Sequence, residues 1–487
     1  MLVKTDLSTI QSYFEDESGL RGGKADNVTL PECESEVSDL LKTCSASKTP
    51  VTVSGAGTGV TGGRVPFGGT LLSLEHFNKI LSINNGSPTP TITVQPAVTV
   101  KEVKEEAKRY SLMYPPDPTE QTSSIGGNIS TNASGSRGLK FGSTRDYVKK
   151  MRIILSSGET LELHRGTIFA DVDGYIDLPC SIRKIRLPEY VLPELKNAAG
   201  YFNRPRMDLI DLFIGHEGTL GVVTEIELKL IPVVERSLAG VIFFKNLKDA
   251  WDFTFKIRQS KDEKVMPLSL EYFDNNALRL LKNDYPLIPD GSRAAIFFEQ
   301  DVSKLNEDKV SDSWSNLLVE CEAPPEWAWF SASVKEQEVF REFRHRLPER
   351  VNEIVRKYGY PKTGTDLAVP FKSFPEMLKI YYDKLGSSKI EYLIFGHIGE
   401  CHLHANLLPT SESEFTESKN IYLELADHAL RLGGTVSAEH GIGKIKHHFL
   451  EKMIGIDGIK EMANMKKLID PACILGLNNL FRPDLLK

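Results

Sequence analysis

The stretch Gly55-Ala56-Gly57-Thr58-Gly59-Val-Thr-Gly62-Gly63-Arg-Val-Pro66-Phe-Gly68-Gly69 decides between two ways of holding an anionic cofactor. Glycine at this density lets backbone N–H groups approach an anion such as a pyrophosphate. Gly57, Gly59 and Gly62 spell GxGxxG, but the Rossmann fingerprint must open a helix. Pro66 and the glycines around it exclude a helix here. We therefore expect an anion-binding loop outside a Rossmann fold, with a flexible glycine loop as the alternative.

Short strands and helices surround this loop. Apolar periodicity predicts helices over 31–45 and 99–110 and strands over 50–54, 70–74, 80–83, 91–94, 151–155, 160–163 and 222–231. Two more loops of glycine and small polar residues lie among them, at 123–136 and 214–221. Pro115-Pro116-Asp117-Pro118 forms a rigid extended segment before the first of these loops.

The second half of the chain has a different pattern, beginning after Pro232. Strands are predicted over 239–244, 294–299, 328–332 and 391–395, and helices over 246–259, 334–358, 373–385 and 414–432. This order, without a strict βαβ repeat, favours an antiparallel sheet covered on one side by helices, so the fold class is α+β. A chain of 487 residues exceeds what one core supports. We place domains at 1–235 and 236–432, followed by a C-terminal segment at 433–487.

Three imidazoles fall within eight residues in Phe395-Gly-His397-Ile-Gly399-Glu-Cys-His402-Leu-His404-Ala-Asn406. On a strand, His402, His404 and Asn406 share one face, and His397 can fold back across the kink at Gly399. Imidazole is a common ligand of zinc and other divalent metals, usually completed by further ligands. The stretch Ser437-Ala-Glu439-His440-Gly441-Ile-Gly443-Lys444 offers a carboxylate and an imidazole. Buried core histidines are the alternative, but both clusters together favour a metal or catalytic site.

These motifs resemble the FAD-linked oxidase family of the vanillyl-alcohol oxidase/p-cresol methylhydroxylase superfamily, in the branch of D-lactate, glycolate and D-2-hydroxyglutarate dehydrogenases. The resemblance covers nearly the whole chain and includes Gly138-Leu-Lys-Phe-Gly142-Ser-Thr-Arg145-Asp146. It implies a two-part FAD-binding domain of the p-cresol methylhydroxylase type at 1–235. It also implies an α+β substrate (cap) domain with an antiparallel sheet at 236–432, which carries the metal-binding histidines. The segment 433–487 would return to the flavin and the metal.

The resemblance further assigns FAD binding to particular residues of the loops. They are Gly55, Ala56, Gly57, Thr58, Gly59, Pro116, Asp117, Ile125, Gly126, Gly127, Asn128, Thr131, Asn132, Gly135, Glu217, Gly218, Thr219, Gly221, Val222 and Asn478. The first glycine loop contains no histidine or cysteine, so we expect the FAD to be bound noncovalently.

The same resemblance implies the catalytic groups. His397, His404 and Glu439 correspond to the ligands of one divalent metal, with zinc as first choice and manganese or iron as alternatives. His440 corresponds to the catalytic base. Arg344, with Arg346 as its rival, matches the arginine that binds the substrate carboxylate. Lys362 and Asn406 would lie on the substrate side, and the family's lysine is either missing here or displaced to Lys362.

Two further departures from the family pattern affect the site. His402 stands where the family often has asparagine, so the number of metal ligands is open. The C-terminal flavin contact, often Asn-Pro-Gly in the family, reads Gly476-Leu-Asn478-Asn479. The fold expectation does not depend on either position, whereas the identity of the substrate does.

The resemblance therefore implies an FAD-dependent dehydrogenase that oxidises a small 2-hydroxy acid to the 2-oxo acid. A quinone, a cytochrome or an electron-transfer flavoprotein would accept the electrons. One alternative is a non-redox flavoenzyme of the alkyl-dihydroxyacetone-phosphate synthase type, which should lack the Glu-His-Gly-Ile-Gly arrangement. The other is a flavin-binding electron-transfer subunit, which would not need an intact set of His397, His404, Glu439 and His440.

Composition excludes several other classes. A net charge of −7 argues against nucleic acid as the main partner. The six cysteines form no CxxC pair, which is typical of reduced thiols in a cytoplasmic protein without an iron–sulfur cluster. The N-terminus does not resemble a signal peptide, and no apolar run is long enough to span a membrane. Peripheral contact with the inner face of a membrane is left open, and a homodimer is compatible with the sequence.

Overall fold

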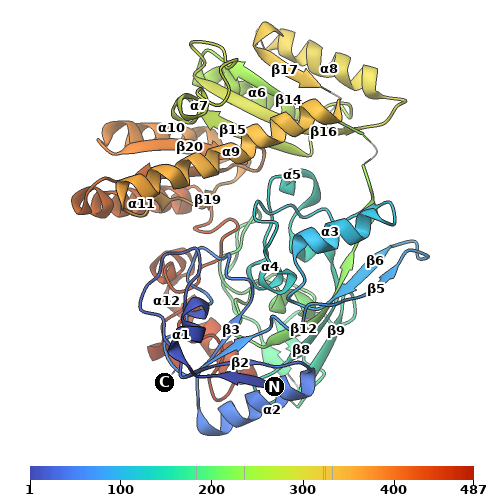
Figure 1. Cartoon of the computed structure of the whole chain (residues 1–487), viewed down its shortest axis with the longest axis vertical. Coiled ribbons are helices and arrows are strands. Elements are labelled where there is room, and N and C mark those ends of the chain that lie inside the picture. The colour runs from blue at the N-terminus through green and yellow to red at the C-terminus, as the bar shows by residue number, and fades with distance from the viewer. Residues whose placement is uncertain are drawn as a thin grey trace. The chain divides into compact units, whose positions relative to one another are not determined.

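The computed structural model of this chain describes residues 1–181, 184–234, 236–260, 262–321, 323, 325–331 and 333–486. The chain divides into two compact units, whose elements are labelled in Figure 1. Unit 1 comprises Met1–Ser134, Ser143–Val233 and Ser437–Lys487, and unit 2 comprises Gly135–Gly142 and Val234–Val436. Unit 1 is therefore assembled from three separate pieces of sequence.

Unit 1 contains two main sheets. The first has the strand order β1 (Leu2–Lys4), β2 (Asn27–Leu30), β4 (Thr70–Ser73), β3 (Val51–Ser54), with the last three parallel. The second is antiparallel, in the order β5 (Ile80–Asn84), β6 (Thr91–Val94), β12 (Val222–Lys229), β8 (Val148–Ile154), β9 (Thr160–His164). Short pairs are β7 (Leu112–Met113) with β13 (Ile231–Pro232), and β10 (Tyr175–Asp177) with β11 (Lys184–Arg186). The helices are α1 (Leu7–Ile10), α2 (Glu34–Ser47), α3 (Val100–Lys108), α4 (Ile125–Thr131) and α12 (His447–Ile469).

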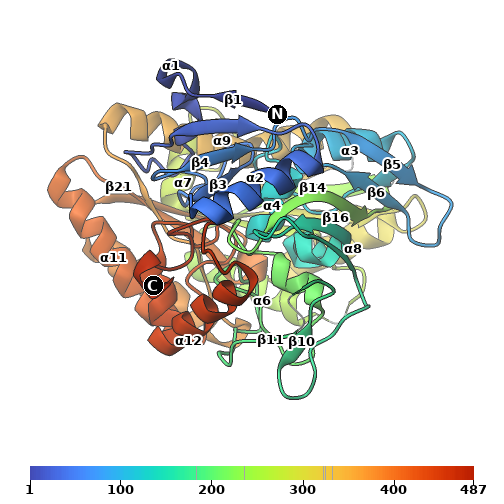
Figure 2. The ribbon, with the colours of Figure 1, turned by 90° about the horizontal axis from the view of Figure 1, so that it is seen from below.

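A core of unit 1 joins α2, both sheets and the C-terminal segment (Figure 2). It includes the fully buried side chains of Val37, Leu41, Leu72, Val222 and Leu475. The C-terminal segment also bonds to β3, because the backbone N–H of Val51 donates to Ile474 O at 2.8 Å and Gly476 N donates to Val51 O at 2.9 Å. The tail of the chain is thus part of the first unit's sheet structure.

The stretch 123–136, which we expected to be a loop, contains the helix α4. The Ser124 side chain caps its first turn by accepting a hydrogen bond from Gly127 N at 3.3 Å. Ile125 and Ile129 lie one turn apart and are both fully buried. The loop prediction was wrong here because the burial of these two side chains outweighs the low helix propensity of the glycines.

Unit 2 is built on one antiparallel sheet of eight strands. Its order is β17 (Ala328–Ser331), β14 (Arg236–Phe244), β16 (Ala294–Val302), β15 (Ser269–Asp274), β20 (Glu391–Gly396), β21 (His402–Leu408), β18 (Thr363–Gly364), and β19 (Leu367–Ala368) also pairs with β21. The helices are α5 (Gly138–Phe141), α6 (Leu247–Gln259), α7 (Asn275–Leu281), α8 (Glu307–Glu320), α9 (Val334–Tyr358), α10 (Phe374–Ser387) and α11 (Glu412–Arg431). The predicted antiparallel sheet and the α+β class are confirmed.

Helices cover both faces of this sheet, whereas the sequence pattern predicted one covered face. Phe243 of β14 and Phe297 of β16 lie in one core with Phe343 of α9. The next residue of β16, Phe298, points to the other face and stacks on Trp314 of α8, with ring centroids 3.8 Å apart. Strand β14 is apolar from Leu238 to Phe244 and β16 from Ala294 to Phe298, as expected of strands buried on both faces.

The short segment Gly135–Gly142 belongs to unit 2, although the predicted domain at 1–235 includes it. Two ion pairs hold it to β16. Arg137 pairs with Glu299 at 2.9 Å and Lys140 pairs with Asp301 at 2.6 Å. The boundaries at 235 and 432 otherwise stay predictions.

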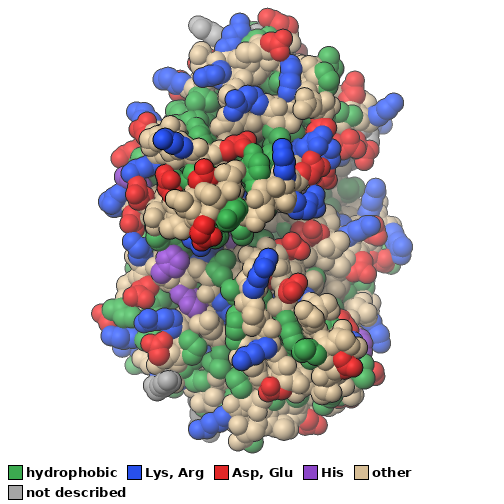
Figure 3. Space-filling model, turned by 60° about the vertical axis from the view of Figure 1, so that its left-hand side comes forward, with side chains coloured by type: hydrophobic (Ala, Val, Ile, Leu, Met, Phe, Trp, Pro, Cys, Tyr) green, Lys and Arg blue, Asp and Glu red, His purple; other side chains and the backbone are tan. Residues whose placement is uncertain are grey.

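The surface agrees with the ordinary charge balance of the sequence. On the face shown in Figure 3, lysine and arginine side chains are interspersed with aspartate and glutamate. Among the helices described, none combines the length and the apolar character needed to cross a membrane.

Candidate active site

The three histidines meet in unit 2 on a hairpin that we call the histidine hairpin, residues 397–406, which comprise the turn after β20 and the start of β21. His402 and His404 lie two residues apart on β21, and their ring centroids are 4.5 Å apart. His397 lies across the turn η6 (Ile398–Glu400), with its ring 5.4 Å and 5.7 Å from the other two. Ligand atoms of the three residues lie within 4.8 Å of one another. The predicted convergence of the imidazoles is confirmed, while their roles as ligands stay predictions.

Each imidazole has an oxygen next to one ring nitrogen. His397 Nδ1 lies 2.7 Å from Glu271 Oε1, and His404 Nδ1 lies 3.1 Å from the carbonyl oxygen of Thr365. A nitrogen that donates to oxygen carries the proton, so both rings have their lone pair on Nε2. For His402, Nε2 lies 3.2 Å from Asp366 Oδ1, which is a charge contact and not a hydrogen bond. The orientation of His397 and His404 by oxygen atoms is typical of histidines that bind a metal.

Arg344 lies beside the histidine hairpin. Its Nε is 3.4 Å from Glu271 Oε2, and Glu271 is the residue that contacts His397. Within the part of the chain that the structure describes, the two Nη groups of Arg344 have no hydrogen-bond or ion-pair partner. The rival Arg346 instead pairs with Asp284 at 3.3 Å and with Glu349 at 2.7 Å. Of the two arginines, only Arg344 is close to the histidines.

The two remaining substrate-side residues lie in different environments. Asn406 is buried on β21 and its Nδ2 donates to the carbonyl of His404 at 3.4 Å. Lys362 is exposed directly before β18. Asn406 therefore lies next to a proposed ligand, whereas no hydrogen bond or ion pair among the described residues links Lys362 to the histidine hairpin.

In unit 1 the predicted flavin loops come together. A side-chain carbon at Gly55 would lie 2.7 Å from Ser124 Oγ, so the first loop packs directly against the start of α4. The second and third loops share backbone hydrogen bonds, from Gly215 N to Ile129 O at 2.8 Å and from Glu217 N to Ser130 O at 2.9 Å. Segments more than 150 residues apart in the sequence thereby form one surface of backbone groups. Their role in holding FAD stays a prediction for each residue.

The first glycine loop fits an anionic group. Residues 55–69, all of them described, contain no helix, which confirms that the GxGxxG spacing is not a Rossmann fingerprint. Gly57 and Gly62 have φ of 83° and 76°, which side chains rarely adopt. Arg64 closes the loop by donating from Nη1 to Gly55 O at 3.0 Å, and its Nε is buried without a hydrogen-bond partner among the described residues. A buried cationic donor beside closely packed backbone suits a pyrophosphate.

A second polar cluster in unit 1, which we call the Glu217 network, consists of Gly63, Glu217, Lys444 and Asn479. Lys444 Nζ donates to Gly63 O at 3.0 Å and to Asn479 Oδ1 at 2.6 Å. Asn479 Nδ2 donates to Gly63 O at 3.0 Å and to Glu217 O at 2.8 Å. Burial raises the pKa of Glu217 to about 7 and lowers the pKa of Lys444 to about 8. The network ties together the first loop, the third loop and the C-terminal segment.

The Glu217 carboxylate also holds the turn that follows Glu439 and His440. It accepts hydrogen bonds from Ile442 N at 2.8 Å and Gly443 N at 2.6 Å. Gly441 has φ of 77°, and a side-chain carbon there would approach Glu217 Oε1 to 2.9 Å. The sequence assigned Glu217 to FAD, but its side chain is engaged with this turn.

Glu439 has a cationic neighbour within unit 1 that the sequence did not indicate. Its Oε2 lies 2.9 Å from Lys196 Nζ and accepts a hydrogen bond from Ser134 Oγ at 3.2 Å. His440 Nε2 lies 3.8 Å from Glu439 Oε1, and its side chain is 33% exposed. His440 is therefore accessible to a substrate, as a base must be.

Two other predicted flavin contacts are engaged with protein. Asp117 pairs with Lys104 and accepts from Gln121 Nε2 at 3.2 Å. Asn478 has φ of 69°, and its carbonyl oxygen lies 2.6 Å from His447 Nε2. Asn479, which the sequence did not single out, makes the hydrogen bonds that link the loops.

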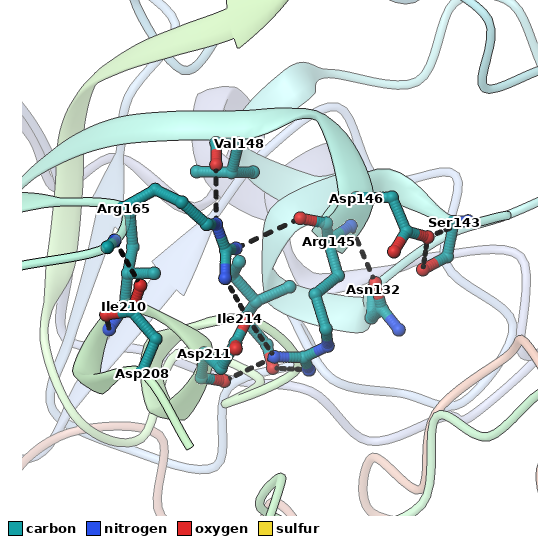
Figure 4. Close-up of polar contacts among 11 residues, drawn as sticks. Asn132, Ser143, Arg145, Asp146, Val148, Arg165, Asp208, Ile210, Asp211 and Ile214 are labelled. Carbon is teal, nitrogen blue, oxygen red and sulfur yellow. Dashed lines mark hydrogen bonds and ion pairs between the residues drawn. The ribbon is translucent and has the colours of Figure 1, made fainter. Parts of the chain in front are cut away.

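Arg145 connects two of the predicted flavin loops by hydrogen bonds (Figure 4). Its backbone N–H donates to Asn132 Oδ1 at 3.0 Å, and its guanidinium donates to the carbonyls of Asp211 at 2.6 Å and Ile214 at 2.5 Å. Arg165 shares the carboxylate of Asp211, with Nη1 2.8 Å from Oδ1. Burial lowers the pKa of Arg145 to about 10, so the side chain stays charged at neutral pH. Arg145 is a structural link between the loops.

Two protein families match this chain. Residues 25–164 match the FAD binding domain family, and residues 234–478 match the family of the C-terminal domain of FAD linked oxidases. The chain is 30% identical over 471 residues to glycolate oxidase subunit GlcD of Bacillus subtilis (strain 168), covering 95% of this chain and 90% of that protein. It is 28% identical over 482 residues to the D-lactate dehydrogenase of Anaerostipes hadrus, covering 96% and 92%.

Two more comparisons bear on substrate and fold. The chain is 28% identical over 490 residues to the D-2-hydroxyglutarate dehydrogenase of Xanthomonas citri pv. viticola, covering 98% of this chain and 94% of that protein. A solved alkyldihydroxyacetonephosphate synthase has a TM-score of 0.67 and 16% identity, covering 97% of this chain and 82% of that one. At this identity the structural likeness shows the shared fold alone.

Proposed function

We propose that this chain, which belongs to the FAD-linked oxidase family, oxidises a 2-hydroxy acid to the 2-oxo acid and passes the hydride to FAD. Relatives named glycolate oxidase, D-lactate dehydrogenase and D-2-hydroxyglutarate dehydrogenase support this substrate class. One observation carries the proposal. Arg344 lies against Glu271, which in turn contacts His397, so a carboxylate-binding group stands next to imidazoles oriented for a metal.

We assign the binding of the substrate carboxylate to Arg344. Its two Nη groups form a planar fork that matches a carboxylate with two parallel hydrogen bonds. Asn406 and Lys362 are proposed as further polar groups on the substrate side. Such contacts fix the position of the carbon that is oxidised, which is a large part of the rate enhancement.

We assign one divalent cation to His397 and His404, with Glu439 as third ligand. Both histidines have Nδ1 next to an oxygen, so each has its lone pair on Nε2. When bound, the cation would supply Lewis acidity at the substrate hydroxyl and FAD would accept the hydride. The alternative ligand is His402, whose Nε2 lies 3.2 Å from Asp366 Oδ1.

His440 is proposed as the base that takes the proton of the substrate hydroxyl. A neutral imidazole can do this at neutral pH. The turn that carries His440 is held by the Glu217 carboxylate through two backbone N–H groups. The base is thereby anchored to the unit that contains the flavin loops.

An anaerobic substrate screen tests the proposal directly. Purified protein is mixed with D- and L-2-hydroxy acids, and the flavin absorbance near 450 nm is followed. Bleaching by a hydroxy acid, but not by the matching simple alcohol, is expected. If no hydroxy acid bleaches the flavin, a non-redox flavoenzyme or an electron-transfer subunit becomes the better assignment. Where a hydroxy acid does reduce the flavin, adding a quinone, a cytochrome or an electron-transfer flavoprotein and following the return of flavin absorbance identifies the electron acceptor.

A pair of arginine variants tests the site itself. Arg344→Gln removes the proposed carboxylate fork and should raise KM by about 30-fold or more, because truncating such a contact costs roughly 2–5 kcal/mol. Arg346→Gln is the matched control, since Arg346 lies on the same helix but pairs with Asp284 and Glu349. An equal effect of both variants on KM would remove Arg344 from the site.

A further inference from the structure

Glu271 is a buried carboxylate in the middle of strand β15, where neither the sequence pattern nor the family resemblance indicated a functional residue. Its side chain is 4% exposed. The strand pairs with β20, which leads into the histidine hairpin, through Tyr272 with Gly396 and Phe273 with Phe395. An ionised carboxylate in such a position is unfavourable unless charged or hydrogen-bonded partners surround it.

The two oxygens of Glu271 have different partners. Oε1 lies 2.7 Å from His397 Nδ1 and 3.4 Å from Ser269 Oγ. Oε2 lies 3.4 Å from Arg344 Nε. One carboxylate therefore connects a proposed metal ligand with the proposed substrate arginine, and both connections lie within unit 2.

We propose that Glu271 is a positioning residue that couples metal binding to recognition of the substrate carboxylate. This inference rests on the proposed function and assigns a role that the function alone does not require. By accepting a hydrogen bond from the Nδ1–H of His397, the carboxylate keeps the lone pair on Nε2 and makes the ring a better ligand. By holding Arg344 through Nε, it leaves the fork of Nη1 and Nη2 for the substrate.

Glu299 provides an internal comparison, because it is a second buried carboxylate on the adjacent strand β16. It pairs with Arg137 at 2.9 Å and with Arg341 of α9 at 3.0 Å. Its side chain is 5% exposed, nearly the same as that of Glu271. Both residues thus pair with an arginine of α9, but no histidine among the described residues pairs with Glu299. If zinc affinity falls in Glu271→Gln but not in Glu299→Gln, the loss comes from positioning of the metal site. A loss of any buried ion pair would affect both variants.

The test measures zinc affinity on FAD-loaded protein from which metal has been removed by chelation. Zinc is titrated in competition with a chromophoric chelator, so the readout does not require turnover. Glu271→Gln should weaken zinc binding by about 10- to 100-fold, the usual effect of removing an oriented partner of a metal-binding histidine. Glu299→Gln should leave zinc affinity within about threefold of the wild type. Equal zinc affinities for wild type and Glu271→Gln, or equal losses in both variants, would overturn the proposal.

A second measurement addresses the coupling. At saturating zinc, Glu271→Gln should still raise the KM for the hydroxy acid, because Arg344 is no longer held in position through its Nε, whereas Glu299→Gln should not. An unchanged KM in Glu271→Gln would overturn the link to Arg344. If Glu271→Gln does not fold, Glu271→Asp serves instead, because its shorter carboxylate cannot reach both partners. Zinc affinity of Glu271→Asp equal to that of the wild type would also overturn the proposal.

The outcomes separate this inference from the proposed function. If wild-type protein binds zinc but no hydroxy acid bleaches its flavin, the substrate class fails, and the zinc comparison of the two glutamates still decides the role of Glu271 at His397. If the wild type binds no zinc and is nevertheless reduced by a hydroxy acid, the metal assignment and the role of Glu271 both fail, while the redox function stands.

Discussion

The histidine hairpin of unit 2 and the Glu217 network of unit 1 are both buried polar clusters, but they are organised in opposite ways. The hairpin collects three imidazoles from eight consecutive residues, and a carboxylate or a carbonyl lies beside one nitrogen of each ring. The network collects four residues from three distant segments, and its charged groups bond to backbone and to the Asn479 amide. The hairpin is therefore suited to bind a cation, whereas the network is suited to hold loops in place.

The largest effect is expected when the hairpin loses a ligand. His404→Ala should abolish stoichiometric metal binding and reduce turnover by about 10³-fold or more, since the Lewis acidity of a metal is worth several kcal/mol. FAD content should be unchanged, because the flavin loops lie in unit 1. Elemental analysis and flavin absorbance measure both properties on the same sample.

The control for this variant is His428→Ala, which removes a histidine of α11 outside the hairpin. The variant His402→Ala tests whether His402 is a metal ligand as well. If it loses metal as completely as His404→Ala, His402 is a ligand and the assignment of only two histidines is wrong. If metal persists, His402 is part of the packing around the site.

The next effect concerns the base on the turn that the network holds. His440→Asn should keep FAD and substrate binding but slow flavin reduction by about 10²–10⁴-fold, the usual cost of removing a general base. The acidic limb of the pH–rate profile should disappear, because the imidazole proposed as the base is no longer present to be protonated. Rapid mixing with saturating substrate measures this rate. A nearly unchanged rate and pH profile would place the base elsewhere, with His402 as the next candidate.

The charged groups of the Glu217 network should make the unfolding free energy depend on pH. The pKa of Glu217 is raised by burial from 4.5 to about 7, so the folded protein holds this proton more firmly than the unfolded chain. Its contribution to the unfolding free energy therefore falls as pH rises from about 4.5 to 7. The pKa of Lys444 is lowered by burial from 10.5 to about 8, so its contribution rises between about pH 8 and 10.5.

Together these two groups predict a minimum of the unfolding free energy between about pH 7 and 8. Each of these two pH-dependent changes is worth at most about 3.5 kcal/mol, since one pKa unit corresponds to roughly 1.4 kcal/mol. Urea unfolding followed by circular dichroism from pH 5 to 10 measures it. Glu217→Gln should flatten the lower limb and Lys444→Met the upper one. Limbs that persist in these variants would show that other groups cause them.

The smallest effect distinguishes two adjacent asparagines. Asn479→Ala removes hydrogen bonds to Gly63 O and Glu217 O, and should lower the unfolding free energy by about 1–3 kcal/mol and loosen FAD. Asn478→Gly is the control, because glycine tolerates the left-handed backbone at φ of 69° and the carbonyl contact to His447 is kept. Its expected change is below about 0.5 kcal/mol. A larger loss in Asn478→Gly than in Asn479→Ala would favour the assignment made from sequence.

The errors of the sequence analysis share a cause. Residues 125–131 were expected to be a loop because glycine and small polar residues disfavour helices, yet two buried isoleucines stabilise α4. The sheet of unit 2 was expected to have one covered face, yet Phe298 packs on Trp314 behind it. Strand β15 was not predicted at all, since Glu271 interrupts an apolar pattern. In each case packing against distant segments outweighs the local preference.

The sequence by itself determined what depends on local backbone geometry. Glycine spacing and Pro66 excluded a Rossmann helix after Gly55, and the period of two along a strand placed His402 and His404 on one face. Only the tertiary structure decided which partners these residues meet. Glu271 reaches His397, and Asn479 reaches Glu217, across more than 100 residues of chain. Such contacts follow from the order and register of the strands and from the return of the C-terminal segment to β3, which no local pattern encodes.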